Sequence, residues 1–347
     1  MAFEDDRMVL LDQTRLPGET VFLEIETPEE TADAIGRLAV RGAMAIAVAG
    51  AYGVLLGAMR AGDDPVGGAS AAVDTIGASR PTARNLFWAL ERMERVVRTS
   101  EGCGNDALRK KLRAEADAIA QDTIQTNQRL VRQGQSLIPR GARALTHCNS
   151  GPLAALVYGT AVGVLIEAHR LGKDIHVLVD ETRPLLQGAR LTTWELAAAG
   201  VPCTLIPDNT AGWAMANGMV DLVITGADRI AANGDSANKI GTYSIAALAG
   251  HHGIPFYVAA PLSTLDLACI AGDSIVIEER SGDEVRRYAG VQVAPKDVPV
   301  FNPSFDVTPA KLIKAIVTEE GVCEPPYVES LKVAVERAAG GEREAWK

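Results

Sequence analysis

From residue 142 onward, short and largely apolar runs alternate with longer segments of helical character. We expect strands at 142–146, 175–180, 203–206, 222–225 and 256–259. Helices are expected between them at 152–170, 189–199, 209–217 and 241–250, and a glycine ends each of the first two. Strands and helices that alternate at this spacing predict a parallel, Rossmann-like sheet. The runs 274–279 and 286–289 predict a further hairpin.

The first 130 residues have a different pattern, in which helices dominate. Strands are expected at 7–11 and 20–26, and helices at 43–60, 82–98 and 106–134, with a loop at 62–68. Thr27-Pro28-Glu29-Glu30 forms a capping box that predicts the start of another helix. The chain therefore predicts an α/β protein with a small N-terminal α+β domain at 1–130 and a Rossmann-like parallel-sheet domain at 131–347.

Composition narrows the classes of function. Hydrophobic residues make up 47% of the 347 residues and aromatic residues only 5%, which suits helices packed on a parallel sheet. A net charge of −10 without a basic run argues against nucleic-acid binding. The N-terminus lacks the features of a signal peptide, and the apolar run 43–59 is slightly short for a membrane span. We therefore expect no association with a membrane. The five cysteines are scattered without a CxxC pair, so we expect a reducing cytoplasm and no disulfide framework.

Polar loops follow three of the predicted strands, at 147–151, 180–183 and 226–229. Ligands of an open parallel sheet bind beyond the carboxyl ends of its strands. Cys148 lies between a strand and a helix predicted to start at Pro152, where backbone amides would stabilise a thiolate. The alternative is a small buried hydrophobic residue. His147 precedes Cys148 in the sequence, but its side chain need not face the same ligand-binding cavity as that of Cys148.

Asp228 follows an apolar strand and Gly226-Ala227. A carboxyl group enclosed by apolar side chains keeps its proton to higher pH and can act as an acid. The alternative roles are a helix N-cap or an ion pair with Arg229.

Three cationic segments precede predicted helices and could bind phosphate: Arg41-Gly42-Ala43, Arg80-Pro81-Thr82, and Asn238-Lys239 before Gly241-Thr242. The alternative for Asn238-Lys239 is an ordinary helix start, and each arginine alone is more often a surface charge. The sequence has no GxGxxG after a strand, no Walker A loop and no histidines at zinc spacing. These features together predict a phosphate-binding enzyme that needs no cofactor and no metal.

The same segments resemble the methylthioribose-1-phosphate isomerases. The resemblance covers nearly the whole chain and is carried by blocks in the family's order: Arg41–Ala43, Arg80–Ala89, Thr146–Gly151, Asp180–Pro184, Leu186–Arg190, Gly226–Arg229, Asn238–Thr242 and Asn302–Pro309. The wider superfamily also contains ribose-1,5-bisphosphate isomerases and regulatory subunits of initiation factor 2B. The Arg-Pro-Thr-Ala and Leu-Gln-Gly-Ala-Arg runs are most similar to the methylthioribose branch.

The resemblance implies a homodimer that converts 5-methylthioribose 1-phosphate into 5-methylthioribulose 1-phosphate in methionine salvage. It implies that Cys148 and Asp228 are the catalytic pair and that the sugar phosphate is bound by seven residues: Arg41, Gly42, Ala43, Arg80, Gln187, Asn238 and Lys239. Met44 and Ala47 depart from the family's pattern, which has Pro and Gly there. The departure leaves 5-deoxyribose 1-phosphate and ribose 1,5-bisphosphate as alternative substrates. A non-catalytic regulatory subunit and a cysteine hydrolase are the alternatives from other classes.

Overall fold

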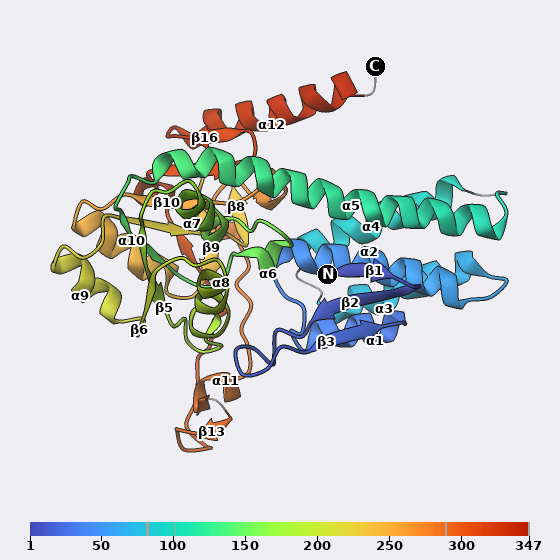
Figure 1. The fold of residues 1–347 in the computed structure, drawn as a ribbon, viewed down its shortest axis with the longest axis horizontal. Coiled ribbons are helices and arrows are strands. Elements are labelled where there is room, and N and C mark those ends of the chain that lie inside the picture. The colour runs from blue at the N-terminus through green and yellow to red at the C-terminus, as the bar shows by residue number, and fades with distance from the viewer. Residues whose placement is uncertain (81–82, 101, 289, 346–347) are drawn as a thin grey trace. The chain divides into compact units, whose positions relative to one another are not determined.

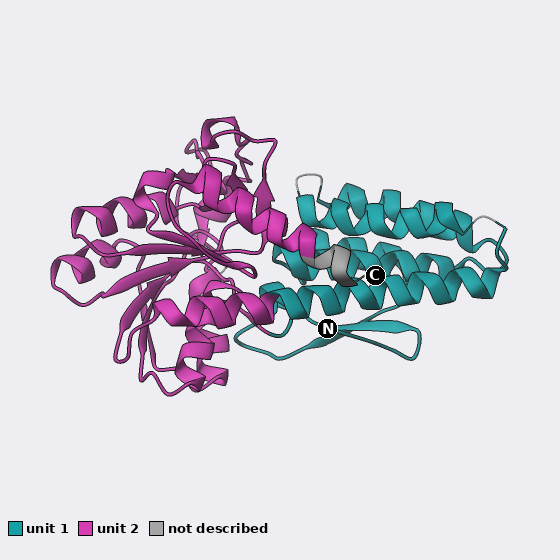
Figure 2. Ribbon diagram, turned by 90° about the horizontal axis from the view of Figure 1, so that it is seen from above, with its two compact units in different colours: residues 1–126, 153–157 teal, residues 127–152, 158–347 magenta. Residues whose placement is uncertain are grey.

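The chain is described by a computed structural model that covers residues 1–80, 83–100, 102–288 and 290–345. It forms two compact units (Figure 2): unit 1 contains residues 1–126 and 153–157, and unit 2 contains residues 127–152 and 158–347. Helix α5 (Asn105–Gly134) passes through the boundary. The predicted boundary between residues 130 and 131 falls in the same helix, so the two units are joined by regular structure rather than by a flexible linker.

Unit 1 combines a small antiparallel sheet with a group of helices (Figure 1). The sheet order is β1-β2-β3, with strands β1 (Ala2–Glu4), β2 (Arg7–Leu11) and β3 (Phe22–Ile25). The helices are α1 (Pro28–Gly36), α2 (Ala43–Arg60), α3 (Pro65–Ser79), α4 (Arg84–Thr99) and the first part of α5. Helix α1 starts with the predicted capping box, in which Thr27 accepts from the backbone of Glu30. Helix α2 has the predicted bounds.

The apolar helix α2 is the centre of the unit 1 core. It is long and apolar enough to span a membrane by composition, but 78% of that window is buried inside the protein. Its neighbours are α3 and α4, and Ile46, Leu55 and Leu56 are almost fully buried. The helix expected at 43–60 is therefore a buried helix of the unit 1 core.

The loop predicted at 62–68 is wrong in its second half, because α3 begins at Pro65. Asp64 caps this helix by accepting from Gly67, and Pro65 occupies its first turn. Gly68 looks like a loop residue, but a Cβ atom there would lie 2.4 Å from the carbonyl oxygen of Gly57. The glycine therefore permits close packing of α3 on α2.

Unit 2 is built on a seven-stranded sheet with the order β16-β15-β10-β7-β4-β5-β6. The five predicted strands are confirmed as β4 (Arg143–Thr146), β5 (His176–Asp180), β6 (Cys203–Ile206), β7 (Leu222–Thr225) and β10 (Phe256–Ala259). They pair in parallel with one another and with β15 (Ala315–Thr318). The antiparallel edge strand β16 (Gly321–Cys323) and β15 were not predicted.

Helices cover both faces of this sheet (Figure 2), and side chains of successive strand residues alternate between two cores. Leu145, Leu178 and Val223 pack with helices α9 (Thr210–Ala216), α10 (Thr242–His251) and α12 (Tyr327–Ala345). Ala144, Val177 and Leu222 face the other core with the end of α5 and helices α7 (Ala161–Arg170) and α8 (Thr193–Ala198). The sheet is apolar on both faces, as expected of a parallel sheet.

A second, four-stranded sheet in unit 2 has the order β11-β8-β9-β14. Its strands are β11 (Leu265–Asp266), β8 (Arg229–Ala231), β9 (Ser236–Lys239) and β14 (Phe305–Thr308). The predicted hairpin of 274–279 with 286–289 is wrong: β12 (Arg287–Tyr288) pairs with β13 (Val291–Gln292) instead, and residue 289 lies outside the described residues. The short elements are η1 (Gln135–Leu137), α6 (Pro152–Ala155), η2 (Gly188–Thr192), η3 (Leu262–Thr264), η4 (Gly272–Ser274), α11 (Asp283–Arg286) and η5 (Ala310–Leu312).

Candidate active site

The strand order of the large sheet reverses between β4 and β7, which makes this the position where a doubly wound sheet binds its ligand. From β4 the chain adds β5 and β6 on one side and then returns to place β7 on the other. The Thr146 hydroxyl donates to the carbonyl oxygen of Ile224 across this pair, over 2.8 Å. The following loops also touch, since a Cβ atom at Gly226 would lie 3.0 Å from that of Ser150. The loops that carry Cys148 and Asp228 are therefore neighbours.

Cys148 has a left-handed backbone with φ of +66°, which is rare for a residue with a side chain. Its peptide groups are held from two directions. The Cys148 N–H donates to the Thr182 hydroxyl over 2.9 Å, and its carbonyl oxygen accepts from the Thr192 hydroxyl over 2.7 Å. Strained residues that the surrounding structure fixes in this way cluster at functional sites. Cys148 is half-buried, so it is not the fully buried hydrophobic residue of the alternative interpretation.

The helix behind Cys148 differs from the prediction of one helix over 152–170. Helix α6 starts at Pro152 as expected but ends at Ala155, and α7 begins only at Ala161. The backbone between them has positive φ at Leu156 and Gly159, and Gly159 packs against the backbone of Gly151. A single helical turn supports a thiolate less than the predicted long helix would, because the dipole effect needs aligned peptide groups.

Asp228 follows β7 and precedes β8, and its N–H donates to the carbonyl oxygen of Ala237 over 2.9 Å. Since a strand follows, the alternative role as a helix N-cap is excluded. Arg229 forms an ion pair with Asp266 at 3.6 Å. The Asp228 side chain is exposed in the described chain, whereas the sequence predicted an apolar enclosure.

The loop after β5 supplies Gln187 and the threonines that hold Cys148. Gln187 is fully buried and directly precedes the π-helix η2, which ends at Thr192. A Cβ atom at Gly188 would lie 1.7 Å from the carbonyl oxygen of Asp180, so this loop folds tightly onto the strand end. Single π-helical turns occur frequently at functional sites. Of this loop, the sequence singled out Gln187 but neither Thr182 nor Thr192.

Asn238 and Lys239 lie on β9, and both side chains are buried. The Asn238 amide donates to the Thr242 hydroxyl over 3.0 Å, and the Lys239 ammonium lies 4.2 Å from the centre of the Phe305 ring. Helix α10 begins at Thr242, as predicted.

The first amides of α10 are engaged by a carboxylate from another strand. Asp306 accepts from Gly241 N–H over 2.7 Å and from Tyr243 N–H over 3.0 Å. A carboxylate at this position fills the anion site of the helix start. This contact was not predictable because Asp306 lies far from α10 along the chain.

Arg41, Gly42, Ala43 and Arg80 belong to unit 1 and are partly buried. Gly42 has φ of +89° and directly precedes α2. A Cβ atom there would lie 2.4 Å from the carbonyl oxygen of Ala154, a residue of unit 1 only six positions after Cys148. Arg80 ends α3, and the adjoining Pro81 and Thr82 of the predicted block lie outside the described residues. Met44 and Ala47 occupy the first turns of α2.

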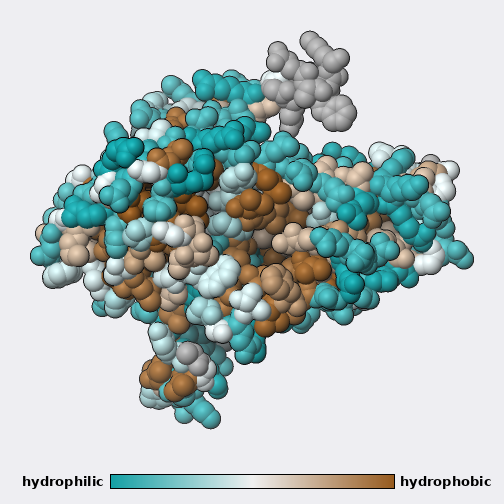
Figure 3. Space-filling model, in the orientation of Figure 1, coloured by the Kyte–Doolittle hydropathy of each residue, from teal (hydrophilic) through white to brown (hydrophobic). Residues whose placement is uncertain are grey.

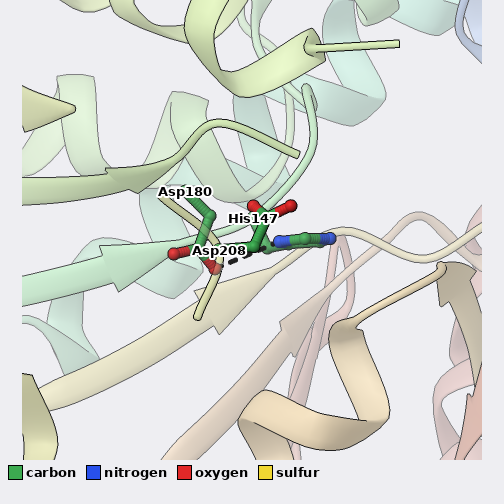
Figure 4. Close-up of side chains that lie close together, drawn as sticks. All are labelled: His147, Asp180 and Asp208. Carbon is green, nitrogen blue, oxygen red and sulfur yellow. Dashed lines mark hydrogen bonds and ion pairs between the residues drawn. The ribbon is translucent and has the colours of Figure 1, made fainter. Parts of the chain in front are cut away.

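A buried polar cluster beside Cys148 was missed by the sequence analysis (Figure 4). Nδ1 of His147 lies 3.1 Å from Oδ2 of Asp180, and its Nε2 lies 2.9 Å from the carbonyl oxygen of Ile240. Candidate ligand atoms of His147, Asp180 and Asp208 lie within 4.8 Å of one another. However, both Asp208 oxygens accept backbone amides, of Thr182 and Arg183, at 2.7 Å. We therefore interpret the cluster as a hydrogen-bonded His–Asp pair and not as a metal site.

A cysteine hydrolase would need a histidine base beside Cys148, and His147, His169 and His176 are poorly placed for that role. Both ring nitrogens of His147 are engaged, as described above. His176 begins β5, at the edge of the sheet opposite the loops, and bonds Thr204 over 2.9 Å. His169 lies in the last turn of α7. This arrangement offers Cys148 no available histidine base among these three, and so disfavours the hydrolase.

Known proteins resemble this chain both in sequence and in fold. The model of the initiation factor 2 subunit family matches residues 39–325. The chain is 49% identical to methylthioribose-1-phosphate isomerase 2 of Pseudothermotoga lettingae, over 97% of this chain and 98% of that protein. The crystal structure of 5-methylthioribose 1-phosphate isomerase from Pyrococcus horikoshii matches with a TM-score of 0.92 and 42% identity, over 96% of this chain and 95% of that one.

A second solved structure, described as the delta subunit of translation initiation factor eIF-2B from A. fulgidus, matches with a TM-score of 0.88 and 42% identity, over 96% of this chain and 98% of that one. Sequence and fold thus agree over almost the entire length. The chain belongs to the initiation factor 2 subunit family and, within it, groups with the methylthioribose-1-phosphate isomerases.

Proposed function

We propose that this chain isomerises 5-methylthioribose 1-phosphate, an aldose phosphate, to 5-methylthioribulose 1-phosphate, a ketose phosphate. The observation that carries the proposal is Cys148, held in a left-handed backbone by two threonine hydroxyls beside the loop of Asp228. The nearly full-length similarity to proteins named for this reaction supports it. We assign the reaction to methionine salvage, the pathway that the resemblance of the sequence implies.

The first chemical step is ring opening. The substrate is a closed furanose whose anomeric oxygen carries phosphate, so it has no free aldehyde. An acid must protonate the ring oxygen, whose bond to C1 then breaks and leaves an oxocarbenium-like centre at C1. We assign this acid role to Asp228. Because Asp228 is exposed in the described chain, the role requires that bound substrate covers the carboxyl group and excludes water.

The second step moves hydrogen from C2 to C1. Cys148, as a thiolate, removes the C2 hydrogen and gives an enol phosphate, which is then protonated at C1. Alternatively, a hydride shifts directly from C2 to C1. In either route the C2 hydroxyl loses its proton as the ketone forms, which balances the proton given to the ring oxygen. The half-buried position of Cys148 supports contact with substrate in both routes.

The remaining predicted residues bind substrate in this proposal. Arg41, Arg80 and Lys239 neutralise the phosphate, with the Arg41 loop completed by Gly42 and Ala43. Gln187 and Asn238 orient the sugar hydroxyls, because both are buried amides, one in the loop after β5 and the other on β9. The steps described use neither a metal ion nor nicotinamide, so turnover should survive exhaustive chelation.

We also propose that the chain works as a homodimer in the cytoplasm. Exposed large apolar side chains are frequent between residues 267 and 301, and the lobe around β13 shows brown apolar surface in Figure 3. They are Leu267, Ile270, Val276, Tyr288, Val291, Val293, Val298 and Phe301. Apolar surface of this kind marks association sites on soluble proteins. Light scattering should give twice the 36.6 kDa chain mass.

Proton NMR of the purified protein with three sugars tests the substrate. We expect turnover of methylthioribose 1-phosphate and 5-deoxyribose 1-phosphate, since apolar pockets discriminate by only about 10–200-fold against a missing apolar group. Ribose 1,5-bisphosphate should not react, because a second phosphate brings charge into a site whose cations already serve the first. Turnover of the bisphosphate alone would contradict the substrate assignment.

The similarity to the A. fulgidus chain favours a second candidate, a regulatory subunit that binds a sugar phosphate without turnover. The two candidates differ in one observable. A regulatory subunit would bind methylthioribose 1-phosphate in calorimetry and leave its proton spectrum unchanged.

A further inference from the structure

His147 joins the loop of Cys148 to the segment that carries Asn238 and Lys239. The ring is 1% exposed, and its two nitrogens contact different parts of unit 2. Nδ1 lies 3.1 Å from Oδ2 of the fully buried Asp180, at the end of β5 (Figure 4). Nε2 lies 2.9 Å from the carbonyl oxygen of Ile240, the residue after Lys239.

The backbone of Gly241 fixes the ring from one side. A Cβ atom at this glycine would lie 3.0 Å from Cε1 and 3.2 Å from Nε2 of His147, and the glycine has φ of +104°. Asp306 in turn holds the N–H groups of Gly241 and Tyr243. The ring therefore lies against the turn that joins β9 to α10, where a side chain on Gly241 would press on it.

Both contacts of His147 require a proton. A carbonyl oxygen only accepts, so Nε2 must carry hydrogen to bond Ile240. Nδ1 and Oδ2 then need a second proton between them, either as an imidazolium beside a carboxylate or as a neutral ring beside a protonated carboxyl. A neutral ring beside an ionised Asp180 makes only one of the two bonds, whichever tautomer it adopts.

The surroundings favour the imidazolium. Burial acts to lower the pKa of His147, but the hydrogen bond to Asp180 and the charges of Asp180 and Asp208 raise it above its ordinary value. Burial raises the pKa of Asp180 to about 6, against the lowering effect of His147. Asp306 faces the ring from β14, and Glu181 lies close to Asp180. Carboxyl groups thus lie near the ring from β5, from β14 and from the loop after β6.

We propose that the His147–Asp180 pair is a positioning device that holds Asn238 and Lys239 in register with Cys148 only while the pair retains its shared proton. The inference rests on the proposed function, since it concerns how the substrate-binding segment is aligned. The pKa of His147 is raised in the folded protein. The hydrogen bonds to Asp180 and Ile240 are therefore both formed below about pH 6.5, the ordinary histidine value, and this double bonding is lost as the pH rises through the raised pKa. Activity should therefore fall on the alkaline side.

Asp180→Asn separates this role from a merely structural one. Oδ1 of Asp180 has no hydrogen-bond partner within the described residues, so either end of the replacing amide can face His147. The amide N–H then donates to a neutral Nδ1 while Nε2–H still bonds Ile240, and neither bond depends on pH. His251→Gln at the end of α10 is the matched control, because this exposed histidine faces His252 and not the site.

The pH profile of kcat/KM for methylthioribose 1-phosphate gives the first readout. In the wild type and in His251→Gln it should fall about three- to tenfold through a pKa above that of free histidine, as expected for the loss of one buried hydrogen bond. In Asp180→Asn this fall should be absent. An alkaline fall that persists unchanged in Asp180→Asn, or a flat profile in the wild type, would overturn the proposal.

Nitrogen-15 NMR of the imidazoles gives a second readout that needs neither turnover nor a stable variant. The chain has only five histidines, so the ring signals are few. Below about pH 6.5, the ordinary histidine value, His147 should show both ring nitrogens protonated, whereas a ring that is still neutral there would overturn the inference. If the protonated ring is found but no sugar phosphate reacts, the proposed function fails while the protonation of the pair stands.

Discussion

The side-chain hydroxyl of Thr192 donates a hydrogen bond of 2.7 Å to the carbonyl oxygen of Cys148. Thr192 is the last residue of the π-helix that follows Gln187, and it also accepts a hydrogen bond from the Asn149 amide over 3.1 Å. Asn149 in turn bonds the buried carboxyl group of Glu195 over 2.5 Å. The left-handed backbone of Cys148 is thus held by side chains of the segment that runs from the end of β5 to α8.

Thr192→Val should lower activity without unfolding the protein. Valine matches threonine in shape but leaves the Cys148 carbonyl without this donor, at a cost of about 1–3 kcal/mol. If the transition state is destabilised by a comparable free energy, kcat should fall about tenfold. Thr192→Ser keeps the hydroxyl and should recover most of the rate. Equal activity of the valine and wild-type proteins would show that this bond does not position Cys148.

Gly42→Ala should destabilise the protein. At φ of +89° a side chain is strained by about 1–3 kcal/mol, and its Cβ atom would also meet Ala154 at 2.4 Å. Gly36→Ala is the control, because nothing lies within 4 Å of a Cβ atom there. Thermal unfolding should show a lower midpoint for Gly42→Ala alone. An unchanged midpoint would mean that the Arg41 loop moves freely away from the 153–157 segment.

Periodicity and capping residues were enough to predict the strands of the parallel sheet and most helices. The Asp64-Pro65 cap of α3 was readable too, but two adjacent glycines concealed it. Gly67 lies against the capping side chain of Asp64, and Gly68 lies against α2. The position of Cys148 and Asp228 after the carboxyl ends of their strands was predicted, whereas the pairing of those strands, β4 with β7, was not. The family resemblance supplied their roles.

Contacts between distant segments were not predictable. His147 meets Asp180 and Ile240, and Asp306 caps α10, only because the two sheets bring those segments together. The break between α6 and α7 was also missed, since the apolar residues there read as one helix. Leu156 takes a left-handed backbone that neither its residue type nor its neighbours indicate.

Asp228→Asn should still bind methylthioribose 1-phosphate but turn it over at least about 100-fold more slowly. An amide keeps the shape of the carboxyl group but cannot deliver a proton, and general acid catalysis contributes about 10²–10⁴-fold. Calorimetry measures binding and proton NMR measures turnover on the same preparation. Lost binding with intact turnover per bound substrate would make Asp228 a binding residue.

Proton NMR of methylthioribose 1-phosphate with wild type, Cys148→Ser and Cys203→Ser tests the central claim most directly. Cys203, a half-buried residue of β6 at the opposite end of its strand from the loops, is the matched control. The wild type and Cys203→Ser should convert the aldose phosphate to the ketose phosphate. Folded Cys148→Ser should be slower by about 10²–10⁴-fold, because a serine hydroxyl is a far weaker acid than a thiol and does not supply the anionic base. Conversion by Cys148→Ser at the wild-type rate, or no conversion by the wild type, would contradict the account.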